Sequence, residues 1–216
     1  RLLPVTANGQ PGAAMYMRNP QTGRHLPFQL HVLDIVPAGI YATYLDEFFP
    51  VVKDLVATTP FQAVPGNHDI ALFDLWARLT RPYARFAEVF GADLEPVHAS
   101  ADLLVVGVNT TRAWRHKNGE VSSVQIERVA KLLNAASPQQ LRLVVVHQPA
   151  AVAHAEEHAN LLRGHDAALG AWSAAGADLV LGGHIHLSYT LAVHGLPRRL
   201  WVLQAGTAIS SRTRPE

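Results

Sequence analysis

The chain has 216 residues, of which 49% are hydrophobic and 16% charged, and its formal net charge is +1. This is the composition of a soluble globular domain with a hydrophobic core, so disordered and fibrous classes are excluded. The near-zero charge gives no electrostatic basis for binding nucleic acid or an anionic membrane, and the absence of cysteine excludes disulfides and thiolate metal sites.

The N-terminal part of the chain has little periodic structure. Residues 1–30 are rich in Pro, Gly and Asn, and only residues 1–5 and 30–33 have the composition of short strands. Between residues 40 and 55, apolar side chains recur at spacings of three and four. That spacing predicts a helix with one buried face.

The next segment combines a short apolar run with a longer helical one. Residues 61–64 are largely apolar and end at Pro65-Gly66, which predicts a buried strand that enters a loop. Residues 72–90 have helical spacing. Pro82 must kink this helix or divide it in two, because proline cannot donate the hydrogen bond that a helix interior requires.

From residue 103 onward, apolar strands alternate with helices. Ser122 and Gln125 form a capping box that begins a helix. Its core face is expected to consist of Ile126, Val129, Leu132 and Leu133. The other expected elements are strands at 103–108 and 141–146, a helix at 167–175, and strands at 178–181, 187–193 and 200–203. This alternation indicates an α/β protein, and no internal repeat or long linker divides the chain.

Three segments share one pattern, in which an apolar run ends in a short loop that carries His or Asn. They are Val64-Pro65-Gly66-Asn67-His68-Asp69, Val144-Val145-Val146-His147-Gln148-Pro149 and Leu181-Gly182-Gly183-His184-Ile185-His186. Ligands of open α/β sheets bind outside the carboxyl ends of the strands, so we expect these loops to converge on one site. Imidazole nitrogens and an amide oxygen are suitable ligands for a divalent metal such as Zn, Mn or Fe.

The block at residues 66–69, the lone His147 and the block at residues 183–186 resemble the last three motifs of the calcineurin-like metallophosphoesterases, in order and in separation. The resemblance runs from about Asp34 to the C-terminus. It implies a layered α/β/β/α sandwich of two mixed sheets flanked by helices. It also implies hydrolysis of a phosphate ester by a metal-activated water, with phosphodiesters favoured over monoesters.

Within that family, residues 72–85 and 108–118 are most similar to the bacterial branch that includes the class III cyclic-nucleotide phosphodiesterases. The expected partner is therefore a small phosphorylated substrate such as a cyclic nucleotide. No apolar stretch reaches the length of a membrane span, and the N-terminus lacks the pattern of a leader sequence. We therefore expect a cytoplasmic protein without a membrane or nucleic-acid partner.

The resemblance implies a centre of two divalent ions, Mn, Fe or Zn. Asn67, His147 and His184 match the ligands of one ion, and His186 matches a ligand of the other. Asp34, which lies 33 residues before Asn67, suits the aspartate that bridges the two ions, although Leu33 stands where the family has glycine. The alternative for Asp34 is an aspartate that caps a strand or faces solvent.

The resemblance also assigns catalytic residues. His68 matches the histidine that is not a ligand but steadies the phosphoryl oxygens or protonates the leaving group, and Asp69 matches the residue that orients it. The alternative for His68 is a structural hydrogen bond within the turn.

The block with which the family begins is missing, because no Asp-x-His precedes residue 67. The second ion thereby loses an anionic ligand, so the chain is expected to bind two ions or only one. The alternative function is a catalytically impaired or inactive domain that keeps the fold and at most one metal. Residues 1–33 match the family poorly, and we expect a single domain over residues 1–216 that is truncated at both ends or mistranslated near its start.

Overall fold

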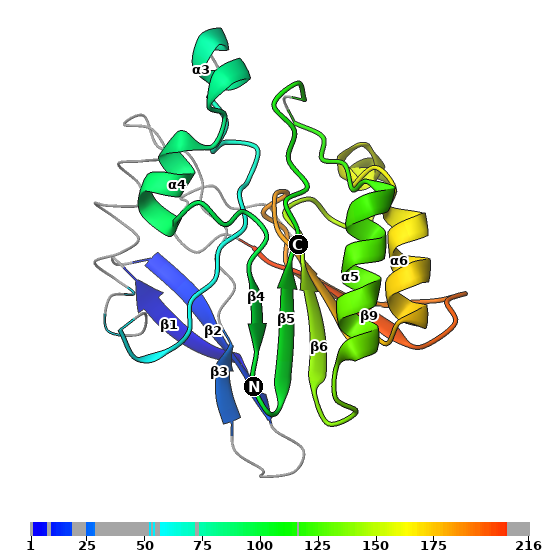
Figure 1. Cartoon of the computed structure of the whole chain (residues 1–216). Helices are drawn as coiled ribbons and strands as arrows, with labels where there is room; N and C mark the ends of the chain where they lie inside the picture. The colour runs from blue at the N-terminus through cyan, green and yellow to red at the C-terminus, as the bar shows by residue number, and fades with distance from the viewer. Residues whose placement is uncertain are drawn as a thin grey trace.

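The computed structural model describes residues 2–7, 10–18, 25–28, 52, 54, 57–71, 74–115 and 117–206. It is an α/β structure built on a six-stranded mixed sheet with the strand order β4-β5-β6-β7-β9-β8 (Figure 1). The strands are β4 (Val97–Ala99), β5 (Leu103–Gly107), β6 (Leu141–Val145), β7 (Leu179–Gly182), β8 (Tyr189–Val193) and β9 (Leu200–Gln204). The predicted α/β class is confirmed.

The four central strands of this sheet run parallel, and the two edge strands run antiparallel to their neighbours. Central parallel strands are covered on both faces, so their sequences are nearly continuous apolar runs. Val106, Val144, Val180 and Val202, one from each central strand, are all 0% exposed. Because these strands are parallel, the loops that follow them emerge at one edge of the sheet.

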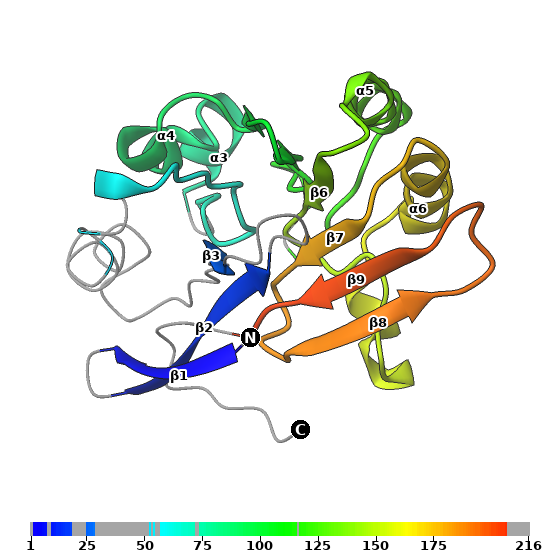
Figure 2. The same cartoon turned by 90° about the horizontal axis from the view of Figure 1, so that it is seen from below.

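Two helices cover one face of the sheet, α5 (Ser123–Ala135) and α6 (His165–Ala174), which lie side by side in Figures 1 and 2. Val129 and Leu133 of α5 are 0% and 1% exposed, and Trp172 of α6 is 0% exposed. Ile126 and Leu132 are partly buried against the same core, which confirms the predicted core face of α5.

The capping box that begins α5 is also confirmed. The amide of Gln125 donates to the Ser122 hydroxyl at 3.2 Å, and the amide of Ser122 donates to the Gln125 side-chain oxygen at 3.0 Å. Each bond satisfies a backbone amide that has no partner within the first helical turn.

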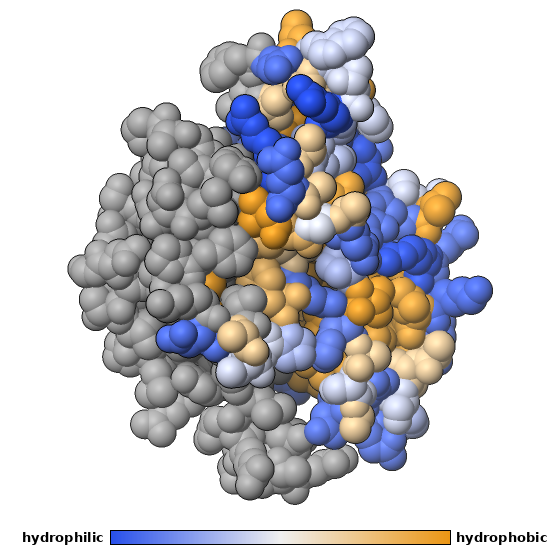
Figure 3. All heavy atoms as spheres, turned by 60° about the vertical axis from the view of Figure 1, so that its left-hand side comes forward, coloured by the Kyte–Doolittle hydropathy of each residue, from blue (hydrophilic) through white to orange (hydrophobic). Residues whose placement is uncertain are grey.

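The predicted helix at residues 72–90 is divided at Pro82 into α3 (Leu75–Thr80) and α4 (Ala84–Phe90). Three apolar side chains of α3 are 68–75% exposed, namely Leu75, Trp76 and Leu79. Figure 3 shows apolar side chains exposed among polar ones at the upper end of the molecule, where α3 lies.

The strand predicted at residues 61–64 is wrong, because these residues join no ladder of the described sheets. Both edges of β5 are already paired, with β4 and β6, so this segment packs on the face of the sheet instead. A Cβ atom placed on Gly107 would lie 2.9 Å from Val64 Cγ1, so the side chain of Val64 fills the space above that glycine. The strand β4 was not predicted.

A second, three-stranded sheet consists of β1 (Leu2–Ala7), β2 (Gln10–Arg18) and β3 (His25–Phe28). It is antiparallel throughout, because connections this short cannot make the crossover that a parallel pair needs. A second mixed sheet of the kind that the resemblance implies is not seen in the described ranges. The strand predicted at 30–33 and most of the helix predicted at 40–55 lie outside those ranges.

The long connection between β6 and α6 contains a 3-10 helix, η2 (Ala155–Asn160), which was not predicted. Among the residues that the structure describes, none of the helices is both long and apolar enough to cross a membrane.

Candidate metal centre

The Gly-Asn-His-Asp block forms a closed turn beside the sheet. The Gly66 amide donates to Asp69 Oδ2 at 2.7 Å, and the Asp69 amide donates to the Gly66 carbonyl at 3.1 Å. Asn67 and Asp69 are each only 6% exposed. Asp69 therefore holds together the turn that presents Asn67 and His68. Its orienting role toward His68 stays a prediction.

The His147 imidazole, which follows β6, lies against the backbone of this turn. A Cβ atom on Gly66 would be 2.8 Å from His147 Cε1 and 3.1 Å from both ring nitrogens. No side chain other than hydrogen fits at residue 66 unless the ring moves. The glycine of the motif is thus explained by the close approach of His147.

Asn67 lies in the first loop and contacts a histidine of each of the other two loops. Its Oδ1 atom lies 2.9 Å from His147 Nε2 and 3.0 Å from His184 Nδ1. The two imidazole rings are 5.1 Å apart between centroids, at an interplanar angle of 70°. The structure therefore brings together the three residues that were predicted to bind one ion.

The loop that carries His184 and His186 has an unusual backbone. Both histidines have positive φ angles, 77° and 59°, in the left-handed region that residues with a Cβ atom seldom occupy. Such strain persists only where surrounding contacts impose it, and it is concentrated at functional sites. Its presence at both histidines of the motif indicates that the function of the site depends on the exact position of their side chains.

Electrostatics at this edge keep His147 neutral. Burial lowers the pKa of His147 well below its ordinary value, and repulsion from His184, His68 and His186 lowers it further. The same repulsion places His68 and His186 in the neighbourhood of His147. A neutral imidazole is the form that binds a metal, so protons compete little for this ligand near neutral pH.

The geometry of Asn67, His147 and His184 fits one divalent ion. Two donor atoms that each lie about 2.1 Å from an ion, at right angles to each other, are about 3 Å apart. Asn67 Oδ1 makes hydrogen bonds of 2.9 and 3.0 Å to the two ring nitrogens, and these lengths equal that separation, so an ion could replace the two bonds with little movement of the side chains. Two imidazole nitrogens and one amide oxygen are ligands that Mn, Fe and Zn accept.

The second ion has less support among the described residues. No group of three or more His, Cys, Asp or Glu side chains there could hold a metal, so the site described above depends on the Asn67 amide. Asp34 lies outside the described residues, and its role stays a prediction. The part of His186 as a ligand of the second ion also stays a prediction.

Two buried residues that sequence reasoning missed hold the backbone of His147 in place through hydrogen bonds. Thr110, 0% exposed, accepts from the His147 amide at 3.3 Å and donates to Gln148 Oε1 at 2.6 Å. Gln148, also 0% exposed, donates to the Lys117 carbonyl at 3.3 Å. A signal was available, since Gln148 is a polar residue at the end of an apolar strand.

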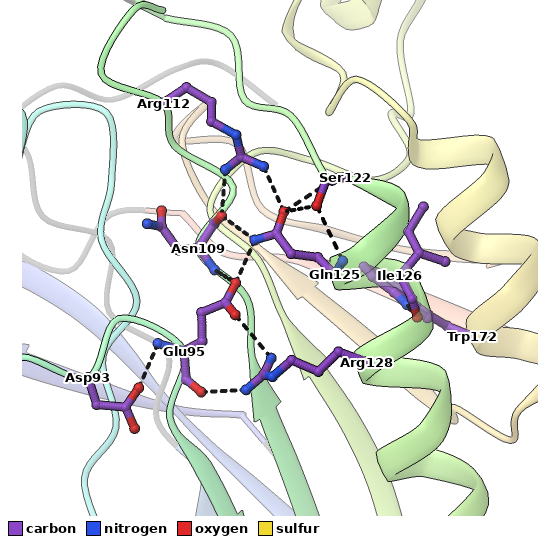
Figure 4. A network of polar contacts seen from close by, with 9 residues as sticks. All are labelled: Asp93, Glu95, Asn109, Arg112, Ser122, Gln125, Ile126, Arg128 and Trp172. Carbon is purple, nitrogen blue, oxygen red and sulfur yellow. Dashed lines mark hydrogen bonds and ion pairs between the residues drawn. The ribbon is translucent and has the colours of Figure 1, made fainter.

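A polar network fixes the segment that carries Thr110 (Figure 4). Glu95 accepts from the Asn109 amide at 3.1 Å and from Gln125 Nε2 at 2.5 Å, and it pairs with Arg128 at 3.2 Å. Arg112 donates to Gln125 Oε1 at 2.6 Å. Gln125, whose side chain completes the capping box of α5, is therefore also the centre of a network that holds the loop after β5 in place.

Comparison with known proteins gives two results. A stretch of 35 residues is 66% identical to the ECF RNA polymerase sigma factor SigG of Mycobacterium tuberculosis, in strains CDC 1551 / Oshkosh and ATCC 25618 / H37Rv. It covers 16% of this chain and only 9% of the sigma factor. The sequence model of the calcineurin-like phosphoesterases matches residues 28–188, which is well over half of the chain and includes all three loops, and it points to no narrower branch. The chain belongs to the calcineurin-like phosphoesterase family.

Proposed function

We propose that this protein hydrolyses a phosphate ester with a divalent ion held by Asn67, His147 and His184. The observation that carries the proposal is the position of Asn67 Oδ1, within 3.0 Å of a nitrogen of both histidines. Family membership supports metal-dependent phosphoesterase activity. A divalent ion in such a site supplies a water of lowered pKa and positive charge for the phosphoryl oxygens.

The protein residues then have separate tasks. Asn67, His147 and His184 hold the ion, and the lowered pKa of His147 keeps its ring neutral, which is the form that binds a metal. His68 follows Asn67 in the same closed turn, which supports a role for His68 beside the ion. We assign to His68 the stabilisation of the phosphoryl oxygens or the protonation of the leaving group.

We further propose a small phosphodiester, such as a cyclic nucleotide, as the substrate. This preference depends on the resemblance of residues 72–85 and 108–118 to the class III branch. The loop at 112–118 has an aromatic and a basic residue turned to solvent, since Trp114 is 72% exposed and Lys117 is also exposed. Aromatic faces stack on bases, which is compatible with a nucleotide.

One observation favours a second candidate, a domain that keeps the fold but does not hydrolyse a substrate. The described residues contain no group of three or more His, Cys, Asp or Glu side chains that could hold a metal. A catalytic centre of two ions requires ligands beyond the three residues that meet at Asn67.

Hydrolysis of a chromogenic phosphodiester and of the matching monoester, measured with and without Mn²⁺ or Zn²⁺, separates the candidates. The proposal predicts metal-dependent release of the chromophore, faster from the diester, and a large loss in His184→Ala. Faster cleavage of the monoester would remove the diester preference alone. No hydrolysis by protein that carries stoichiometric metal would favour the inactive domain.

A further inference from the structure

A buried glutamine from another strand contacts the loop that carries His184. Gln204 is the last residue of β9 and is only 2% exposed. Its Nε2 atom donates to the Gly183 carbonyl. A polar side chain in the core needs a partner of this kind, because burial without one is costly.

The contact falls on the peptide that determines the direction of His184. The Gly183 carbonyl belongs to the peptide bond between Gly183 and His184, and it also accepts from the Ile185 amide at 2.9 Å. On the other side, the Gly183 amide donates to the His147 carbonyl at 2.9 Å. The two contacts therefore hold the peptide bonds before and after Gly183, immediately before the residue with φ of 77°.

The left-handed conformation of His184 needs such support. For a residue with a Cβ atom, this conformation is unfavourable and persists only when neighbouring contacts impose it. The Ile185 contact is local to the loop, whereas Gln204 ties the loop to β9 of the sheet. Gly182 leaves room for this contact, because a Cβ atom there would lie 2.6 Å from Gln204 Oε1.

We propose that Gln204 is a positioning residue that holds His184 in its strained conformation and thereby directs Nδ1 toward Asn67. The proposal rests on the proposed function only in its metal-binding consequence. It assigns a role in the site to a residue that lies 20 positions after His184 and outside the three loops.

Two substitutions remove the contact in different ways. Gln204→Met keeps nearly the same volume but has no amide donor. Gly182→Ala leaves Gln204 in place but displaces its amide, since the added Cβ would lie 2.6 Å from Oε1, closer than the two atoms can approach. Leu203→Met is the matched control, because it is a conservative change at the preceding, half-buried position of the same strand.

The first measurement is the nuclear magnetic resonance spectrum of the metal-free protein, with ¹⁵N-labelled histidine. We expect the backbone and ring signals of His184 to shift in Gln204→Met and in Gly182→Ala, and to stay unchanged in Leu203→Met. Unchanged His184 signals in both test variants would overturn the proposal, and so would an equal shift in the control. This measurement needs no metal, so it decides the proposal even if the proposed function fails.

The second measurement is the affinity for Zn²⁺ by calorimetry. Residues behind a metal ligand typically contribute about 10- to 100-fold to metal affinity. We expect a loss in that range for each test variant. The double variant should lose little more affinity than either variant alone, because both changes remove the same interaction, the contact between Gln204 and the Gly183 carbonyl. Additive losses would mean that the two residues act separately, which contradicts the proposal. Absence of Zn²⁺ binding by the parent protein would overturn the proposed function instead.

Discussion

Thr110→Val removes one buried hydroxyl and leaves the volume of the side chain almost unchanged. Thr110 is 0% exposed, and its hydroxyl makes a 2.6 Å hydrogen bond to Gln148 Oε1 and a longer one, 3.3 Å, to the His147 amide. Valine makes neither, so two buried polar groups lose a partner. Each such loss costs about 1–3 kcal/mol, and the long bond belongs at the lower end of that range.

We therefore expect Thr110→Val to lower the free energy of unfolding by about 2–4 kcal/mol. For a domain of this size, that corresponds to a fall in Tm of roughly 5–15 °C. Because the His147 amide is one of the two groups affected, metal affinity should fall as well. Thr110→Ser keeps the hydroxyl and should restore most of both quantities.

Urea unfolding of the metal-free protein measures the first quantity, and calorimetric titration with Zn²⁺ measures the second. Thr190→Val is the matched control, since Thr190 is exposed on the edge strand β8 and such substitutions usually change stability by less than about 0.5 kcal/mol. If Thr110→Val is no more destabilising than Thr190→Val, the buried hydroxyl does not have the role described here.

Three further predictions concern other parts of the protein. Gly66→Ala should displace the His147 ring, which lies 2.8 Å from the added Cβ, and should lower Zn²⁺ affinity in calorimetry. His68→Ala should lower kcat by on the order of 10²- to 10⁴-fold with metal content unchanged, whereas His184→Ala should lose metal and activity together, as elemental analysis and ester hydrolysis will show. Burial raises the pKa of Tyr189 above its ordinary value of 10.0, so the folded state retains a proton that the unfolded state releases, and stability falls as the pH rises above that value. In urea unfolding at pH 9 and pH 11, Tyr189→Phe should lose less stability across this range than the parent protein.

The elements that could be predicted are those that neighbouring residues determine. The capping box of Ser122 and Gln125 is a local signal, and the helix that follows it begins where predicted. Pro82 divides a helix for a reason contained in its own ring. The loops after β6 and β7 could be placed at one edge because apolar runs indicate parallel strands, which end on the same side of a sheet. The turn at residues 66–69 meets them there, although the apolar run before it is not a strand.

The features that could not be predicted depend on residues far apart in the chain. Residues 61–64 have the composition of a strand, but whether they join a sheet depends on the two neighbours that already occupy the edges of β5. Thr110 supports His147 from 37 positions away, and Gln204 contacts a loop 21 positions earlier. The pairing of such polar side chains is decided by the packing of the sheet and leaves no periodic signal in the sequence.

The positive φ angles of His184 and His186 belong to the same group. Glycine is the usual residue at left-handed positions, and although Asn, Asp and His are found there more often than other residues, a histidine by itself does not indicate such a backbone. The local preference fails here, and such failures are expected at functional sites, where strain is maintained by surrounding contacts.

The central claim is that Asn67, His147 and His184 hold one divalent ion, and calorimetric titration with Zn²⁺ tests it most directly. The parent protein and the variants Asn67→Ala, His147→Ala and His184→Ala would be compared after removal of metal, with circular dichroism to confirm that each is folded. We predict one tight site in the parent protein that each of the three substitutions abolishes. A tight site that survives all three substitutions in folded protein would contradict the claim.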